Sequence, residues 1–139
     1  MEERSLKNDL DFGLKSQVEV LETLRKYFDE TIEETKEPYC AYDGECPEKN
    51  TRYEIKARRC SFSTYPTTII PYSKRKAAKE DTRLLFVFRF TDGLYYIQYK
   101  QELFDTFDTK DVTYYRKGIT PRPAKHYCIP TELLLKIEL

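Results

Sequence analysis

The amino-acid sequence predicts an α/β domain in which helices flank a mixed β-sheet. Apolar residues recur with a helical period over residues 12–35. Polar and apolar residues alternate over residues 51–59, as in a strand with one buried face. Two apolar segments, 84–90 and 94–99, flank an Asp-Gly pair that is typical of a hairpin turn. At 139 residues the chain fits one domain, 1–139, with residues 1–10 as a frayed arm.

The first expected element is an amphipathic helix that Asp11 caps. Its apolar face consists of Leu14, Val18, Leu21, Leu24, Phe28 and Ile32. Gln17 lies on the same face. Its amide is either buried and bonded to backbone or directed at a functional site.

A hairpin is expected next. Residues 39–42 form a short strand, Asp43-Gly44 a turn, 44–50 a polar loop, and 51–59 the return strand. The return strand directs Glu54 and Lys56 to one face because side chains alternate along a strand. This pair is either a solvated ion pair at a sheet edge or part of a metal-dependent hydrolytic site, which needs a carboxylate and a cationic side chain.

The second half of the chain is expected to complete the sheet. We expect a hydroxyl-rich loop or crossover over residues 60–70 and a short basic helix over 72–80. A central strand over 84–90 then pairs with a strand over 94–99. The chain continues with a short helix or loop over 101–109, a strand over 111–117, a basic loop over 118–127 and a closing helix over 132–135.

Charge is distributed unevenly although 24 basic residues balance 24 acidic ones. Residues 1–39 hold eleven acids and six bases, a net of minus five, whereas 49–79 hold nine bases and one acid, a net of plus eight. That one acid is Glu54. A basic segment around a single carboxylate suits a polyanion held next to a cation.

The four cysteines do not predict a zinc site, because no Cys-x-x-Cys pair occurs and the chain has one histidine. The sequence shows no signal peptide and no apolar run long enough for a membrane span. We therefore expect an intracellular protein, cytoplasmic or nuclear, with reduced cysteines and no membrane partner.

The arrangement Asp43…Glu54-Ile55-Lys56 resembles the PD-(D/E)XK nuclease superfamily, which includes restriction enzymes and Holliday-junction resolvases. Residues 11–17 and 65–74 also resemble segments of small viral and phage nucleases of this kind. The resemblance implies a restriction-endonuclease-like core of αβββαβ order. It further implies a DNA endonuclease, which would act on a particular DNA structure as resolvases do.

The resemblance also implies roles for individual residues. Asp43, Glu54 and the carbonyl of Ile55 would bind Mg²⁺, with Mn²⁺ as the alternative, and Lys56 would orient water or stabilise charge. Gln17 stands where many relatives have a glutamate. The residues expected to contact DNA are Arg58, Arg59, Tyr65, Lys74, Arg75, Lys76, Arg116 and Arg122.

The expected partners are DNA and a second copy of the chain, since a duplex has two strands to cut. The alternative is a module of the same fold that binds nucleic acid or protein without catalysis. The amide of Gln17 favours that alternative, whereas Asp43, Glu54 and Lys56 favour the enzyme.

Overall fold

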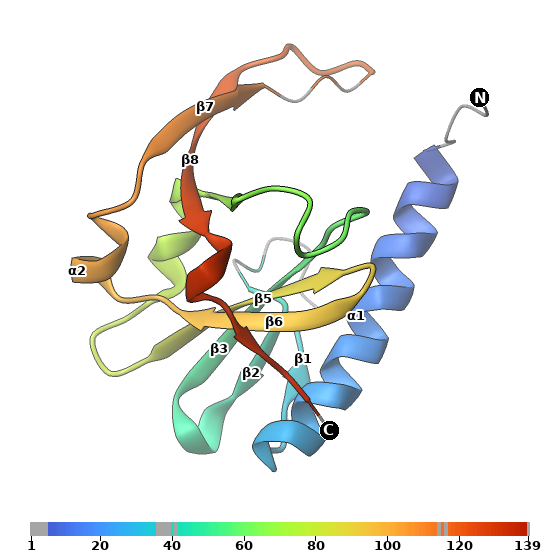
Figure 1. Ribbon diagram of the computed structural model, residues 1–139. Coiled ribbons are helices and arrows are strands. Elements are labelled where there is room, and N and C mark those ends of the chain that lie inside the picture. The colour runs from blue at the N-terminus through green and yellow to red at the C-terminus, as the bar shows by residue number, and fades with distance from the viewer. Residues whose placement is uncertain (1–5, 36–39, 41, 114, 116, 139) are drawn as a thin grey trace.

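The computed structural model describes residues 6–35, 40, 42–113, 115 and 117–138, with the backbone alone for 6–16. One long helix, α1 (Leu6–Phe28), lies along a six-stranded sheet, sheet A (Figure 1). The strands of sheet A, in spatial order, are β1 (Glu33–Glu34), β2 (Gly44–Cys46), β3 (Thr51–Ala57), β5 (Arg83–Phe90), β6 (Gly93–Gln98) and β9 (Leu135–Lys136). A three-stranded sheet, sheet B, consists of β4 (Thr67–Pro71), β8 (Pro123–Pro130) and β7 (Thr109–Thr113).

Sheet A is mixed because β3 and β5 are parallel, whereas its other neighbouring strands are antiparallel. A parallel pair needs a crossover connection. Here the crossover carries β4 and a short 3-10 helix, η2 (Tyr72–Ala77). Because β4 pairs with β8, the crossover joins sheet A to sheet B.

The two faces of sheet A pack against different partners. On one face, Leu21 and Leu24 of α1 belong to an apolar core with Tyr53 and Ile55. On the other face, Phe86 and Phe88 belong to a core with side chains of sheet B and the short helix α2 (Gln101–Phe104). The register pairs Glu54 with Phe86 and Lys56 with Phe88. Adjacent residues of paired strands share a face, so Glu54 and Lys56 lie on the sheet B side.

The α/β class and the mixed sheet are confirmed, but the covering layers differ from expectation. We expected helices to flank the sheet, whereas sheet B covers the face opposite to α1. The short helix expected over residues 72–80 is present as the 3-10 helix η2, and β4 lies where a loop or crossover was expected over residues 60–70. Residues 118–127, expected to form a loop, include the start of β8. Pairing of β4 with β8 joins distant segments, and a local sequence pattern does not encode it.

Several boundaries of the first half also differ. Helix α1 begins at Leu6, so Asp11 lies inside it rather than at its cap. The helix ends at Phe28, before the expected end at residue 35, because Asp29 adopts a left-handed conformation with φ of 50°. The strand expected at 39–42 falls partly outside the described residues. The partner of β3 is β2, and the turn between them is the 3-10 helix η1 (Pro47–Lys49).

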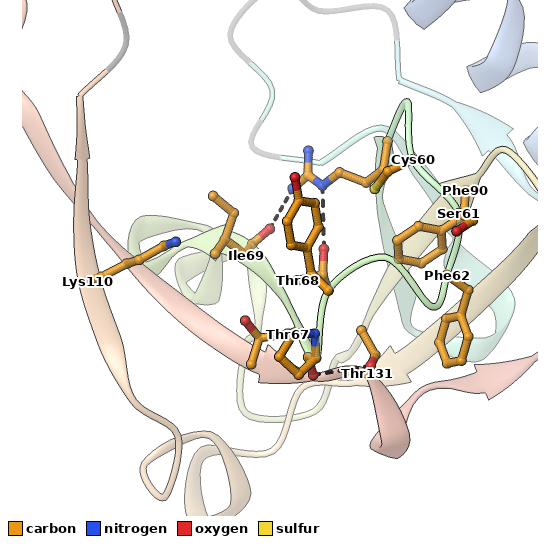
Figure 2. Close-up of a pocket in the computed structure, with 12 residues that line it drawn as sticks. Cys60, Ser61, Phe62, Thr67, Thr68, Ile69, Phe90, Lys110 and Thr131 are labelled. Carbon is orange, nitrogen blue, oxygen red and sulfur yellow. Dashed lines mark hydrogen bonds between the residues drawn. The ribbon is translucent and has the colours of Figure 1, made fainter.

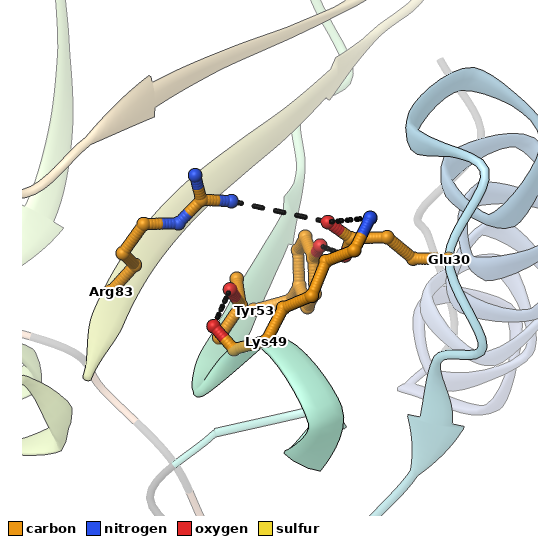
Figure 3. A network of polar contacts seen from close by, with 5 residues as sticks. Glu30, Lys49, Tyr53 and Arg83 are labelled. Atoms are coloured by element: carbon orange, nitrogen blue, oxygen red, sulfur yellow. Dashed lines mark hydrogen bonds and ion pairs between the residues drawn. The ribbon is translucent and has the colours of Figure 1, made fainter. Parts of the chain in front are cut away.

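The end of the first hairpin is attached to the segment after α1 through Glu30. The side chain of Glu30 is 3% exposed and forms ion pairs with Lys49 at 3.5 Å and Arg83 at 3.9 Å (Figure 3). It also accepts a short hydrogen bond from the hydroxyl of Tyr53. Burial and this bond raise the pKa of Tyr53 well above its ordinary value. The network attaches the N-terminal half of β3 to the segment that follows α1.

In the part of the chain that the structure describes, no helix is long and apolar enough to cross a membrane. The homodimer stays a prediction. The closing segment, expected as a helix over 132–135, is a 3-10 turn, η3 (Thr131–Leu133), followed by β9. Leu133 and Leu135 are exposed there, beside the edge of sheet A.

Candidate active site

Asp43 lies directly opposite Glu54, one residue before β2 begins. The register of β2 with β3 pairs Gly44 with Tyr53, which places the preceding residue across from Glu54. The backbone amide of Asp43 donates to the carbonyl of Tyr53 at 2.8 Å. Its carboxylate oxygen Oδ2 accepts from the amide of Ile55 at 2.8 Å. The Asp43 carboxylate thus accepts the hydrogen bond from Ile55 that a backbone carbonyl of a longer β2 would otherwise accept.

Glu54 is a buried carboxylate whose two oxygens have different surroundings. The residue is 2% exposed. Its Oε1 lies 3.5 Å from Nζ of Lys56 and 3.2 Å from Nζ of Lys74. Among the residues that the structure describes, its Oε2 has no hydrogen-bond partner. A buried carboxylate oxygen without a partner is costly, and most such atoms in folded proteins are satisfied.

The electrostatic balance at Glu54 raises its pKa above the ordinary value for a glutamate. Burial is the main cause, and the negative charge of Asp43 adds to it. The ammonium groups of Lys56 and Lys74 act in the opposite direction without cancelling the effect. Two carboxylates that repel each other in a poorly solvated site are an arrangement that a bound cation relieves.

The backbone carbonyl of Ile55 points toward the edge where Asp43 lies. The N–H and C=O of one strand residue point to the same side of the strand. The N–H of Ile55 meets Asp43, while the N–H of Arg58 donates to Arg89 of β5 on the other side. The expected ligand set of Asp43, Glu54 and the Ile55 carbonyl therefore comes from one short stretch of the β2–β3 edge.

This donor set suits a hard cation. Carboxylate and carbonyl oxygens are the ligands of Mg²⁺, which keeps several waters and often binds through one or two carboxylates plus substrate phosphate. Among the described residues there is no group of three or more His, Cys, Asp or Glu side chains that would hold a metal. All four cysteines are free thiols. The residues present fit a magnesium-type site built on two carboxylates.

Lys74 belongs to this site, although the sequence predicted it as a DNA contact. It comes from η2, and the crossover brings it over the face of sheet A that Glu54 occupies. Its side chain is about as exposed as that of Lys56, 27% against 28%. The sequence held no signal for this pairing, because it depends on how the crossover packs.

The other predicted DNA contacts that the structure describes divide into half-buried and exposed residues. Arg58 is half-buried and structural in part, since Nη2 donates to the carbonyl of Ile69 at 2.5 Å. The guanidinium of Arg75 lies 3.9 Å from the ring centre of Tyr72. Arg116 lies outside the described residues. The exposed members are Arg59, Tyr65, Lys76 and Arg122.

Lys125 was not among the predicted DNA contacts. Its ammonium lies 4.4 Å from the ring centre of Tyr72, the ring that Arg75 also covers. Strand β8 thus adds a cation to the basic surface of η2. The signal was present in the sequence as a basic segment without acids, but that segment was expected to be a loop.

Gln17 lies on α1, which packs on the face of sheet A opposite to Glu54. The residue is half-buried. No hydrogen bond joins it to Asp43 or Glu54 among the described residues. Nearby on the helix, Glu19 forms an ion pair with Arg89 at 3.6 Å. The proposed catalytic role of Gln17 stays a prediction.

Comparison with known proteins gave no match: no family model, no curated protein and no solved structure is significantly similar to this chain.

Proposed function

We propose that this chain is a metal-dependent deoxyribonuclease that hydrolyses phosphodiester bonds, with a site of PD-(D/E)XK type. The observation that supports it most is the buried Glu54, which lies opposite Asp43 and beside Lys56 and has one oxygen without a hydrogen-bond partner among the described residues. A hairpin that contributes both carboxylates and a following parallel strand, β5, are consistent with a restriction-endonuclease-like core.

Each residue then has a chemical task. Asp43, Glu54 and the Ile55 carbonyl would hold Mg²⁺, which polarises the phosphate and lowers the pKa of bound water. Lys56 neutralises charge that develops on the phosphate oxygens and orients the attacking water. Lys74 holds the Glu54 carboxylate in place. In the reaction a water oxygen bonds to phosphorus, one P–O bond breaks, and a proton passes to the leaving oxygen.

A second function is favoured by one specific observation. Two ammonium groups already flank Oε1 of Glu54. Buried ion pairs of this kind also occur as structural features without catalysis. A chain in which Lys74 has permanently replaced the cation would bind nucleic acid through its basic surface and would not cleave it.

The deciding experiment is cleavage of end-labelled DNA in Mg²⁺ or Mn²⁺, with duplex, single-stranded, flap and four-way junction substrates. The native chain is compared with Asp43→Asn, Glu54→Gln and Lys56→Ala. Glu102→Gln is the matched control, because Glu102 is an exposed glutamate on α2. Circular dichroism and thermal melts confirm that each variant folds.

We expect metal-dependent cleavage by the native chain and the Glu102→Gln control. Each of the three site variants should lose about a hundredfold or more, as when a preorganised electrostatic group is removed from an active site. Cleavage that survives in Glu54→Gln and Asp43→Asn would contradict the proposal. Binding by the native chain without cleavage of any substrate would support the second function.

A further inference from the structure

A cavity of about 440 Å³ lies beyond the end of β3, the strand that carries Glu54 and Lys56. Arg58 forms part of its wall, together with the loop after β3, strand β4 and Lys110 of β7. Figure 2 shows Thr67, Thr68 and Ile69 of β4 on one side and Phe62 and Phe90 on the other. Its volume is within the range of sites that bind small molecules or single groups of a larger ligand.

The cavity wall is held in place by contacts on both sides. The amide of Phe62 donates to Asp92 at 2.9 Å, and the ring of Phe62 stacks on Tyr95 with the ring centres 4.0 Å apart. The hydroxyl of Thr131 donates to the carbonyl of Pro66 at 3.1 Å. These bonds fasten the loop that bears Tyr65 at both ends, so the cavity is formed before a ligand binds.

The side chains of the wall suit a planar ligand that has hydrogen-bonding groups and is attached to a negatively charged group. Aromatic rings offer flat apolar surface, here from Phe62 and from Tyr65, which is 62% exposed, whereas Phe90 is 3% exposed and buried within the wall. Thr67 is exposed, and its hydroxyl can donate or accept, whereas the hydroxyls of Ser61 and Thr68 already contact Thr64 at 2.8 Å and Arg58 at 3.5 Å. Arg58 and Lys110 add positive charge, and none of the described lining residues is acidic.

The cavity and the candidate active site share one face of β3. The amide of Arg58 donates to Arg89 at 2.7 Å, so the pairing with β5 continues one residue past β3. Glu54, Lys56 and Arg58 are therefore successive residues on the same face. Consecutive residues on one face are about 7 Å apart. Lys56 of the candidate active site is thus one such step from Arg58 in the cavity wall.

We propose that this cavity binds one unpaired nucleobase of the DNA strand whose phosphate lies at Glu54 and Lys56. The inference rests on the proposed function, from which it takes DNA as the ligand, and it names the substrate class. A base inside a duplex cannot reach the cavity, so the substrates are single-stranded DNA or duplexes with an unpaired, unstacked nucleotide. The hydroxyl-rich wall accepts more than one base.

The test measures binding in EDTA, where metal-dependent cleavage does not interfere. The probes are a fluorescein-labelled hairpin with one bulged thymidine, the same hairpin with an abasic site at that position, and a fully paired hairpin. Tyr65→Ala is the cavity variant. Tyr115→Ala is the matched control, since Tyr115 is 81% exposed and does not line the cavity. Both residues are exposed, so both variants should fold.

We expect the native chain and Tyr115→Ala to bind the bulged hairpin about tenfold more tightly than the abasic one, as base–aromatic stacking gives. Tyr65→Ala should lose most of that difference. Equal affinity of the native chain for the bulged and abasic hairpins would overturn the base pocket, even if metal-dependent cleavage is found. A base-dependent affinity in a chain that cleaves nothing would support the pocket and reject the nuclease.

Discussion

Glu30 and Glu54 are both buried carboxylates attached to β3, and their surroundings differ in one decisive respect. Each side chain is 3% exposed, and each lies near two cationic side chains. Glu30 uses both oxygens, since Oε1 faces Lys49 and Arg83 and Oε2 accepts from Tyr53. Glu54 uses only Oε1 among the described residues, and Asp43 repels it.

We infer from this difference that Glu30 stabilises the fold, whereas Glu54 contributes little to stability. A buried charge that is fully paired and hydrogen-bonded is costly to disrupt, because its partners are left unsatisfied. A buried charge that keeps an open oxygen and a like-charged neighbour contributes little to stability and is available to a ligand. Active sites are typical places for such unfavourable arrangements.

The largest stability effect should follow from Glu30→Ala. The change leaves the hydroxyl of the fully buried Tyr53 without its partner and opens a small cavity, whereas Lys49 and Arg83 can turn to solvent. We expect a loss of about 2–4 kcal/mol in the free energy of unfolding. Urea denaturation followed by circular dichroism measures it. If the free energy of unfolding falls by less than in an exposed control such as Glu102→Ala, Glu30 does not stabilise the fold.

A smaller effect of opposite sign is expected from Glu54→Gln. The substitution removes a poorly solvated charge and its repulsion with Asp43, and both lysines are partly exposed and can turn to water. We expect unfolding free energy to be unchanged or higher by about 1 kcal/mol at pH 7, while cleavage is lost. A destabilisation as large as that of Glu30→Ala would show that Glu54 is structural.

Because the pKa of Glu54 is raised, the stability difference between the native chain and Glu54→Gln should depend on pH. Because the folded chain holds this proton more tightly than the unfolded chain, the ionised side chain opposes folding. The contribution of Glu54 to stability is therefore most favourable below its unfolded pKa of about 4.5. It falls as the pH rises from there through the folded pKa. The unfolding free energy of Glu54→Gln minus that of the native chain should increase over this range. A flat or decreasing difference would contradict the assignment.

A bound divalent cation should offset the unfavourable contribution that the ionised Glu54 side chain makes to folding. If Asp43 and Glu54 hold Mg²⁺ or Mn²⁺, the cation at ten times its dissociation constant stabilises the native chain by about 1.4 kcal/mol. Thermal melts at pH 7.5 with increasing Mn²⁺ measure the shift in Tm. Asp43→Asn and Glu54→Gln should lose the shift, and Glu30→Gln should keep it. An equal shift in all variants would place the cation elsewhere.

The sequence predicted the part of this site that lies within one hairpin. Alternation along residues 51–59 was enough to place Glu54 and Lys56 on one face, which the structure bears out. It could not show that Lys74 reaches Glu54, because that contact depends on the packing of the crossover. Glu30 was missed because the apolar period of α1 continues through Ile32 and predicted a helix there, whereas Asp29 ends it.

Sheet B could not be predicted from the sequence, because it also depends on contacts between distant segments. Strands β4 and β8 are far apart along the chain. Both contain proline, and β4 also contains two threonines, residue types that also suit loops. Sheet B covers the face that Glu54 occupies, and its strand β4 lines the cavity. The residues of the candidate site were therefore predictable in part, whereas its burial and the cavity beside it were not.

The smallest effects should come from the lysines that serve the two carboxylates. Lys49→Ala removes a half-exposed partner of Glu30 while Tyr53 and Arg83 remain, so we expect a loss of at most about 1 kcal/mol. Lys74→Ala should change stability by a similarly small amount at pH 7, yet it should raise the pKa of Glu54 further, since Lys74 lowers it. Stability measured between pH 4 and pH 8 separates the two variants: only Lys74→Ala should show a steeper decline with pH than the native chain. The same decline in both would mean that Lys74 does not act on Glu54, and that Oε1 is neutralised by Lys56 alone.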